Sequence, residues 1–86
     1  MKRIWKYSLE IADVQEFEMP RKHCVLSVQV QDGMPVLWAM VDEGSTSVVV
    51  TVKCYGTGRP CDENPDSHIG TVQIGRFEWH YFEVTR

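Results

Sequence analysis

The short run Gly56-Thr57-Gly58-Arg59 contains the residue types best suited to bind an anion. Glycines let backbone N–H groups approach a negative charge closely, a threonine hydroxyl adds a hydrogen bond, and an arginine grips a phosphate or carboxylate with two parallel bonds. Tyr55 precedes the run and offers an aromatic face. We therefore predict a ligand site at Tyr55, Gly56, Thr57, Gly58 and Arg59. The alternative is a turn that ends a strand, in which the glycines serve the backbone alone. This alternative stays open because a P-loop leads into a helix, whereas this run does not.

Catalysis by a nucleophile needs a Ser, Thr or Cys held beside a base. The chain contains three histidines: His23, His68 and His80. No motif places one of them next to a nucleophile, although a Cys61 and His68 pair stays open at this stage. The paired carboxylates Glu16 and Glu18 are typical of the charged guard on an exposed sheet edge. We expect no catalytic residues, no enzyme activity and no cofactor.

The potential metal ligands of the chain are concentrated in one loop: Cys61, Asp62, Glu63, Asp66 and His68. The chain has no Cys-x-x-Cys or His-x-His pair, and a zinc site built on one thiol and one imidazole needs two more ligands from elsewhere. The pattern favours a solvated acidic loop. We predict no metal site.

Composition restricts the possible partners. The 86 residues are enough for one domain, residues 1–86, with an adequate core. The net charge is −3 and the basic residues are scattered, which argues against DNA or RNA. No segment approaches the roughly 18 apolar residues of a membrane helix, and the start lacks the apolar core of a signal peptide. The three cysteines are an odd number and predict reduced thiols.

The strongest local signal is a β-hairpin between Cys24 and Asp42. Two apolar runs are joined across Asp32-Gly33, where glycine accommodates the positive φ of a tight turn. The second run, Val36 to Val41, is apolar on both faces and therefore needs cover on both, from a second sheet or a partner. Alternation in the first run predicts four core residues: Cys24, Leu26, Val28 and Val30.

Period-two alternation predicts strands in most of the remaining chain, and no segment has the period of a helix. The expected strands are residues 5–11, 14–19, 47–55, 68–74 and 77–84, with the second at a sheet edge because Pro20 cannot donate a backbone hydrogen bond. Cys54 is expected to face the core. We predict an all-β fold: a single small antiparallel β-sandwich or open barrel of six to seven strands.

Four motifs follow one another along the chain: Ile4-Trp5-Lys6-Tyr7, Leu26-Ser27-Val28-Gln29-Val30-Gln31, Leu37-Trp38-Ala39-Met40-Val41-Asp42 and Gly56-Thr57-Gly58. In this order they resemble a family of short, uncharacterised proteins of tailed bacteriophages and prophages. The resemblance spans nearly the whole chain and brings no catalytic residue with it. Members commonly continue the glycine run as Gly-Thr-Gly-His-Pro. Here Arg59 takes the place of that histidine, so no imidazole role carries over.

Membership in a phage family implies an accessory protein that acts on host defence. The resemblance therefore leads us to expect a non-enzymatic binding module in the host cytoplasm. It would be a homo-oligomer that sequesters a nucleotide-derived immune signal or binds a host immune protein. The alternative is a structural or regulatory accessory protein that docks on a host or virion protein through a sheet edge.

Overall fold

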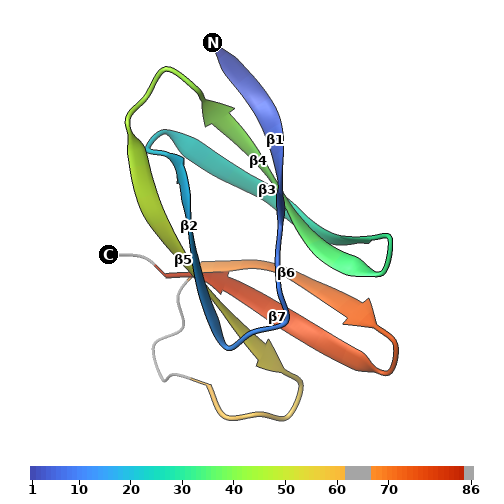
Figure 1. The fold of residues 1–86 in the computed structure, drawn as a ribbon. Helices are drawn as coiled ribbons and strands as arrows, with labels where there is room; N and C mark the ends of the chain where they lie inside the picture. Colours follow the sequence, from blue (N-terminus) through green and yellow to red (C-terminus); the bar gives the residue numbers. More distant parts are fainter. Residues whose placement is uncertain (62–66, 85–86) are drawn as a thin grey trace.

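The computed structural model describes residues 1–61 and 67–84, which form seven antiparallel strands in two sheets (Figure 1). The predicted all-β fold is confirmed. One sheet has the order β1-β4-β3 and the other the order β2-β5-β7-β6. The strands are β1 (Lys2–Ser8), β2 (Val14–Pro20), β3 (His23–Gln31), β4 (Met34–Asp42), β5 (Ser47–Gly56), β6 (Ser67–Ile74) and β7 (Phe77–Glu83).

The predicted hairpin is the pair β3 and β4. Gln31 pairs with Met34, and the two residues between them, Asp32 and Gly33, have φ values of 53° and 79°. Two successive positive φ values are those of a type I′ turn, whose twist matches that of the flanking strands. Val30, which was expected in the core, is exposed near the tip of this hairpin.

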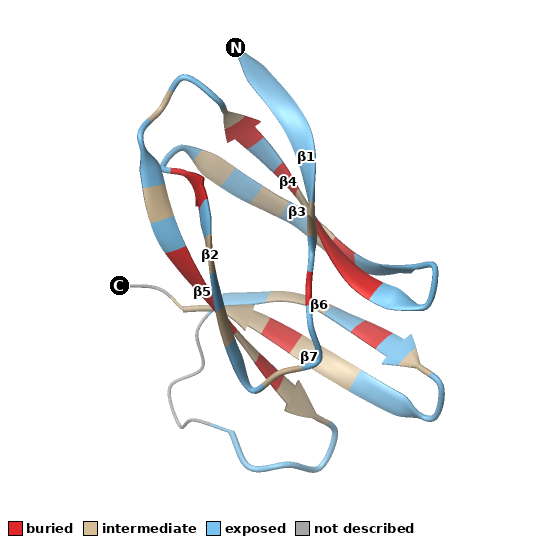
Figure 2. Ribbon diagram, in the orientation of Figure 1, coloured by how far each residue is buried: buried red, intermediate tan, exposed pale blue. Residues whose placement is uncertain are grey.

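The core lies between the inner faces of the two sheets (Figure 2). Cys54 is buried there, as the alternation of β5 predicts. Tyr81 is fully buried, and its hydroxyl donates a hydrogen bond to the Glu10 carbonyl, 3.0 Å away. The buried core residues are Leu9, Met19, Val28, Leu37, Ala39, Val41, Val50, Val52, Cys54, Val72 and Tyr81.

The prediction of which β3 residues face the core was wrong for the first half of the strand. A register shift between Val25 and Ser27 marks a β-bulge at Leu26. The extra residue switches the faces of the residues that precede it. Cys24 is consequently exposed, and Leu26 is 48% exposed. Of the four residues expected in the core on this strand, Val28 alone is buried.

The first strand is shorter than predicted, because β1 ends at Ser8. Leu9 is buried, but its N–H donates to the Pro35 carbonyl as the chain leaves the strand. The Gln15 side-chain amide then bonds both the N–H and the carbonyl of Glu10. This connection turns the chain towards β2, and it leaves Ile11 exposed instead of on an inner strand face.

The two sheets meet along one margin, where β3 lies beside β6. Gly70 of β6 makes this approach possible, because a Cβ atom there would lie 2.7 Å from the Val28 Cβ. On the opposite margin, the rings of Tyr7 on β1 and Phe17 on β2 are stacked 5.4 Å apart. β1 and β2 are therefore the free edges of the two sheets, and both lie on the same margin (Figure 1).

The outer face of β4 is covered only in part. Lys6 extends over the Trp38 ring, with its Nζ 5.9 Å from the centroid and 2.7 Å from the Gln31 side-chain oxygen. In the next row, Ile4 and Met40 pair across the strands and stay exposed. The second sheet thus covers the inner face of the hairpin, while the outer face keeps an uncovered apolar row. No helix in the described residues is long and apolar enough to span a membrane.

Candidate functional site

The predicted glycine run forms a β-turn at the end of β5. The Arg59 N–H donates to the Gly56 carbonyl at 3.1 Å, and Gly58 has a φ of 85°, as the third residue of a type II turn requires. The Thr57 N–H donates to the Glu78 carbonyl at 3.3 Å. Because these two N–H groups are engaged within the protein, the turn offers a ligand mainly side chains. Gly58 supplies the positive φ of this turn. Both the predicted ligand site and the alternative, in which the glycines serve the backbone alone, stay predictions.

Trp79 of β7 lies directly against this turn. Gly56 pairs with Trp79 across the sheet, and a Cβ atom at position 56 would lie 3.2 Å from the indole Cζ3. A side chain here would press on the ring, so the glycine lets the half-buried indole cover the end of β5. The sequence did not assign Trp79 to the ligand site, because the position of Trp79 depends on the pairing of β5 with β7.

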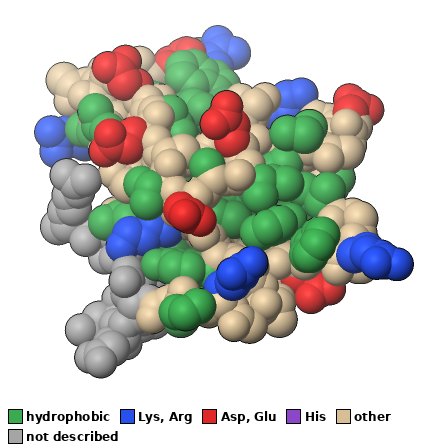
Figure 3. Space-filling model, turned by 60° about the horizontal axis from the view of Figure 1, so that its bottom comes forward, with side chains coloured by type: hydrophobic (Ala, Val, Ile, Leu, Met, Phe, Trp, Pro, Cys, Tyr) green, Lys and Arg blue, Asp and Glu red, His purple; other side chains and the backbone are tan. Residues whose placement is uncertain are grey.

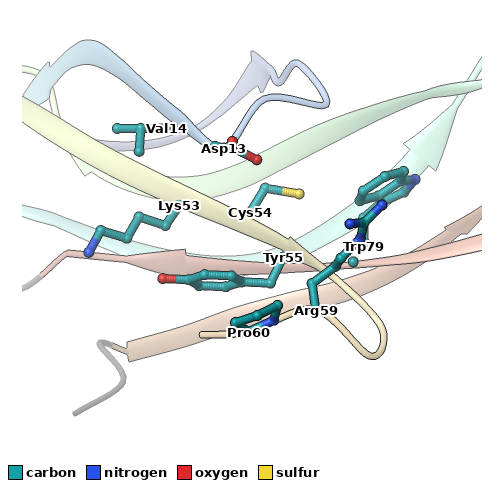
Figure 4. A pocket seen from close by; sticks show the side chains of 9 residues that line it. Asp13, Val14, Lys53, Cys54, Tyr55, Arg59, Pro60 and Trp79 are labelled. Atoms are coloured by element: carbon teal, nitrogen blue, oxygen red, sulfur yellow. The ribbon is translucent and has the colours of Figure 1, made fainter. Parts of the chain in front are cut away.

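A hollow of about 680 Å³ opens on one side of the turn (Figure 4). It forms because β2 begins at Val14 opposite Lys53, so the rest of β5 has no neighbouring strand on that side. The last contact is the Cys54 N–H, which donates to the Asp13 carbonyl. Residues that line this hollow include Asp13, Tyr55, Gly56, Arg59, Pro60 and Trp79.

A second hollow of about 450 Å³ lies on the other side of the same turn. Its lining includes Thr57, Arg76 and Phe77, and it shares Gly56, Arg59 and Trp79 with the first hollow. The rings of Phe77 and Trp79 are 5.9 Å apart. At this end of the molecule, hydrophobic side chains gather, and both basic and acidic side chains lie around them (Figure 3).

Arg59 is an exposed cation that lines both hollows. Its side chain extends from the turn alongside the Trp79 indole (Figure 4). It makes no ion pair and no side-chain hydrogen bond with any residue in the described part of the chain. An arginine of this kind binds phosphate or carboxylate in a fork geometry, and an indole face stacks on planar rings. The arrangement is chemically suited to a ligand that combines an anion with a flat aromatic group.

The structure brings three of the predicted residues together at the first hollow: Tyr55, Gly56 and Arg59. Thr57 lines only the second hollow of the two, and Gly58 lines neither. The Tyr55 ring packs edge to face against Phe82 on the outer face of the four-stranded sheet, with centroids 5.7 Å apart.

A chain of side-chain hydrogen bonds runs from the turn across that outer face. The Thr57 hydroxyl is 2.7 Å from His80 Nε2, and His80 Nδ1 is 3.0 Å from the Thr71 hydroxyl. The Thr71 hydroxyl also lies 2.9 Å from His68 Nε2. A hydroxyl has a single proton, so Thr71 donates to at most one of the two imidazoles, and at least one imidazole donates to Thr71. The chain fixes the Thr57 side chain and couples the tautomers of His80 and His68.

The third histidine, His23, lies elsewhere. Its Nδ1 is 2.7 Å from the Pro20 carbonyl oxygen, and its Nε2 is 3.1 Å from a Glu83 carboxylate oxygen, so it links β3 to β7. In the described residues no cysteine is hydrogen-bonded to a histidine, including the Cys61 and His68 pair that the sequence left open.

The described residues contain no group of three or more His, Cys, Asp or Glu side chains that could hold a metal ion. Three of the candidate ligands, Asp62, Glu63 and Asp66, lie outside the residues that the structure describes. Cys61 is exposed, and His68 is bonded to Thr71. The absence of a metal site stays a prediction.

A family model for a domain of unknown function, DUF7352, matches residues 1–86. The chain belongs to the DUF7352 family. No curated protein and no solved structure matches it.

Cys54 lies below the first hollow of this DUF7352 domain. Burial raises the pKa of its thiol, although a hydrogen bond with Tyr81 acts in the opposite direction. Burial and the neighbouring Cys54 likewise raise the pKa of the Tyr81 phenol. A thiol that stays protonated is a poor nucleophile. Cys54 therefore belongs to the core beneath the site and does not supply a reactive thiolate.

Proposed function

We propose that this DUF7352 protein is a phage-type, non-enzymatic binding module that counters host defence by holding a nucleotide-derived immune signal. The observation that carries the proposal is Arg59, which has no partner among the described residues and lies beside the Trp79 indole at a hollow of about 680 Å³. The phage origin rests on the four sequence motifs, and the role against host defence follows from that origin.

The chemistry of the site supports a nucleotide over a simple anion. A base stacked on an aromatic side chain gains about 1–3 kcal/mol, and Arg59 grips a phosphate group with charge-assisted bonds. Arg76 lines the second hollow and adds a second cation. Since both hollows share Arg59 and Trp79, a ligand can place its base in one and a phosphate in the other.

Binding without turnover fits the groups around Arg59. Cys54 is kept protonated by burial, and the Thr57 hydroxyl is already bonded to His80. Cys54 has no histidine hydrogen-bonded to it in the described residues. The Thr57 hydroxyl does lie beside a base, 2.7 Å from His80 Nε2, and in the proposed module this pair holds the Thr57 side chain in place. A module of this kind withholds its ligand from a receptor and releases it unchanged when it unfolds.

Native mass spectrometry of the protein purified from host cells tests the proposal. We expect an additional mass of a few hundred daltons, on the order of a nucleotide, that is lost on denaturation. The ligand should be recovered unchanged and should bind again to the refolded protein. A protein that carries no added mass from infected cells, and that binds none of a panel of mono- and cyclic dinucleotides, contradicts the proposal.

A second candidate is an accessory protein that docks on a host or virion protein through a sheet edge. The uncovered row of Ile4, 60% exposed, and Met40 favours it, because this row borders the free edge of β1. Exposed apolar residues next to a free edge suit β-strand addition by a partner. This function predicts a specific protein in pull-downs that is lost in the Ile4→Asp variant, and no bound small molecule.

A further inference from the structure

We propose that two copies of this chain associate through their free edges, with β1 of each copy pairing antiparallel with β2 of the other. This would extend each sheet of one copy into the opposite sheet of the second copy. The proposal concerns a surface remote from the glycine turn, and it does not depend on ligand binding there.

The first argument is the position of the two edges. β1 and β2 each have one neighbouring strand, and the Tyr7 and Phe17 rings hold them on the same margin of the molecule. They run in opposite directions along that margin (Figure 1). A twofold axis parallel to the strands therefore places β1 of each copy beside β2 of the other copy. The dimer then has two equivalent β1–β2 pairs, and no free edge is left on this margin. Closed twofold dimers of this kind are the commonest oligomers.

The second argument is the regularity of the edges. β1 and β2 are each seven residues long, and their ladders with β4 and β5 run without a register shift. The strands on the other margin, β3 and β6, each contain a bulge. Bulges and irregular pairing protect an edge from another strand. The two free edges lack this protection, and their equal lengths match.

The third argument is charge. β1 carries the cations Lys2, Arg3 and Lys6 and no acidic residue, whereas β2 carries Glu16 and Glu18 and no basic residue. Like charges on directly opposite residues destabilise a strand pair, and opposite charges stabilise it. Pairing of β1 with β1, or of β2 with β2, is therefore disfavoured, and pairing of β1 with β2 is selected. The charges that disfavour pairing of an edge with its own copy therefore favour pairing of β1 with β2.

The faces of the two strands are also compatible. Lys6 pairs with Trp38, and Glu16 pairs with Thr51, which places both charges on outer faces. A register that sets Lys6 opposite Glu16 of the second copy sets Trp5 opposite Phe17 on the inner face. Trp5 is 37% exposed in the single chain, so this contact would cover it.

Charge reversal on each edge tests the arrangement. One variant carries Lys2→Glu with Lys6→Glu on β1, and the other carries Glu16→Lys with Glu18→Lys on β2. These changes leave the ion pair between Arg3 and Glu43 in place. They remove the bond from Lys6 to Gln31 and the bond from Thr51 to Glu16, so the folding of each variant is checked by circular dichroism. Lys22→Glu, in the turn before β3, is the control for a charge change away from the edges.

Sedimentation and light scattering give the mass of each protein. We expect a dimer for the wild type and for the Lys22→Glu control. For each edge variant we expect a dimer dissociation constant at least tenfold larger. An equimolar mixture of the two edge variants should form a dimer again. The chain with all four substitutions should also dimerise, because its edges are complementary again. If β1 paired with β1 of the second copy, the β2 variant would still dimerise fully; if β2 paired with β2, the β1 variant would. Full dimerisation of either variant alone therefore overturns the proposal.

The wild type provides a test that is independent of how the variants fold. Hydrogen exchange at the β1 and β2 amides should slow as the protein concentration rises, and raising the salt concentration should weaken the dimer, since exposed charges are screened. A wild-type protein that stays monomeric at every concentration also overturns the proposal. So does a wild-type protein in which the concentration-dependent protection from hydrogen exchange occurs only at amides outside β1 and β2.

Discussion

Gly70 on β6 lies so close to Val28 on β3 that a Cβ atom added to the glycine would be 2.7 Å from the Val28 Cβ and 3.1 Å from the Val28 nitrogen. Real Cβ atoms essentially never lie within 3.0 Å of such a neighbouring heavy atom, and Val28 is itself buried. This contact sets the distance between the two sheets along the margin where they meet. The absence of a side chain at one position is thus a requirement of the whole sandwich.

Gly70→Ala is therefore expected to destabilise the protein. The added methyl group must push β6 away from β3, and overpacking of this kind costs about 1–3 kcal/mol. Urea unfolding of the variant and the wild type measures the difference. Gly44→Ala is the matched control, because a Cβ there would lie 3.4 Å from the Asp42 carboxylate, near ordinary contact. Equal losses in both variants would show that the β3 and β6 approach is not the cause.

Arg59→Ala is expected to weaken ligand binding without changing the melting temperature. The side chain is exposed and makes no hydrogen bond or ion pair with the described residues, so its loss removes neither from the fold. Hydrogen bonds to a charged group are worth about 1.5–3 kcal/mol, which corresponds to a roughly 10- to 150-fold weaker affinity. Calorimetry with the ligand identified by mass, or with a nucleoside diphosphate as probe, gives the value.

Arg21→Ala is the matched control for this change, since Arg21 is also exposed and its side chain bonds only to Thr46 in the described structure. It should leave the affinity unchanged. An Arg59→Ala variant that binds as tightly as the wild type would remove the glycine turn from the site, whatever the ligand.

Thr71→Val is expected to uncouple the two histidines on the outer face of the four-stranded sheet. Valine keeps the shape of threonine but cannot bridge His80 Nδ1 and His68 Nε2. Long-range proton–nitrogen NMR spectra report the tautomer of each ring. We expect both rings to change in Thr71→Val and neither to change in Thr71→Ser, which keeps the hydroxyl. A response of one ring alone would contradict the coupling.

The parts of the fold that the sequence predicted well are those with local causes. The Asp32-Gly33 turn follows from backbone sterics, and the inward position of Cys54 follows from the alternation of a regular strand. The bulge at Leu26 has no such signature, because an apolar residue in an apolar run fits either face. Cys24 was therefore assigned to the wrong face.

The candidate site shows the same division. Arg59 was found from the chemistry of its own segment, since glycines, a hydroxyl and a guanidinium are adjacent in the sequence. Trp79 was not assigned to the site, because it reaches Gly56 through the register of β5 with β7. That register depends on packing between strands far apart in the chain, which a local pattern does not contain. The sequence shows that residue 79 is aromatic, but it does not show that this residue lies beside Gly56.

Two tyrosines whose hydroxyl groups have different surroundings, Tyr81 and Tyr7, are expected to respond differently to the loss of those groups. The Tyr81 hydroxyl donates to the Glu10 carbonyl, so Tyr81→Phe should cost about 1 kcal/mol of stability. The buried Tyr7 hydroxyl has no hydrogen-bond partner in the described structure. Tyr7→Phe should therefore be neutral or stabilising, because it removes an unsatisfied polar group. Each variant controls for the other in denaturant unfolding, and a larger loss in Tyr7→Phe would contradict this assignment.

Stability is expected to fall at alkaline pH because of two acids in the core. Burial raises the pKa of Cys54 above its ordinary value of 9.0 and the pKa of Tyr81 above its ordinary value of 10.0. Well below pH 9 both groups are protonated in the folded and unfolded chains, so neither of them adds a pH dependence to the free energy of unfolding. Above that pH the unfolded chain releases protons that the folded chain retains, and the free energy of unfolding decreases.

Urea unfolding at a series of pH values measures this decrease. In Tyr81→Phe the phenol is absent, so the fall above about pH 10 should be shallower than in the wild type, even though the variant is less stable at neutral pH. Tyr7→Phe should retain the contribution of Tyr81. A wild-type stability that stays level through the alkaline range, or the same slope in Tyr81→Phe, would mean that Tyr81 does not remain protonated in the core.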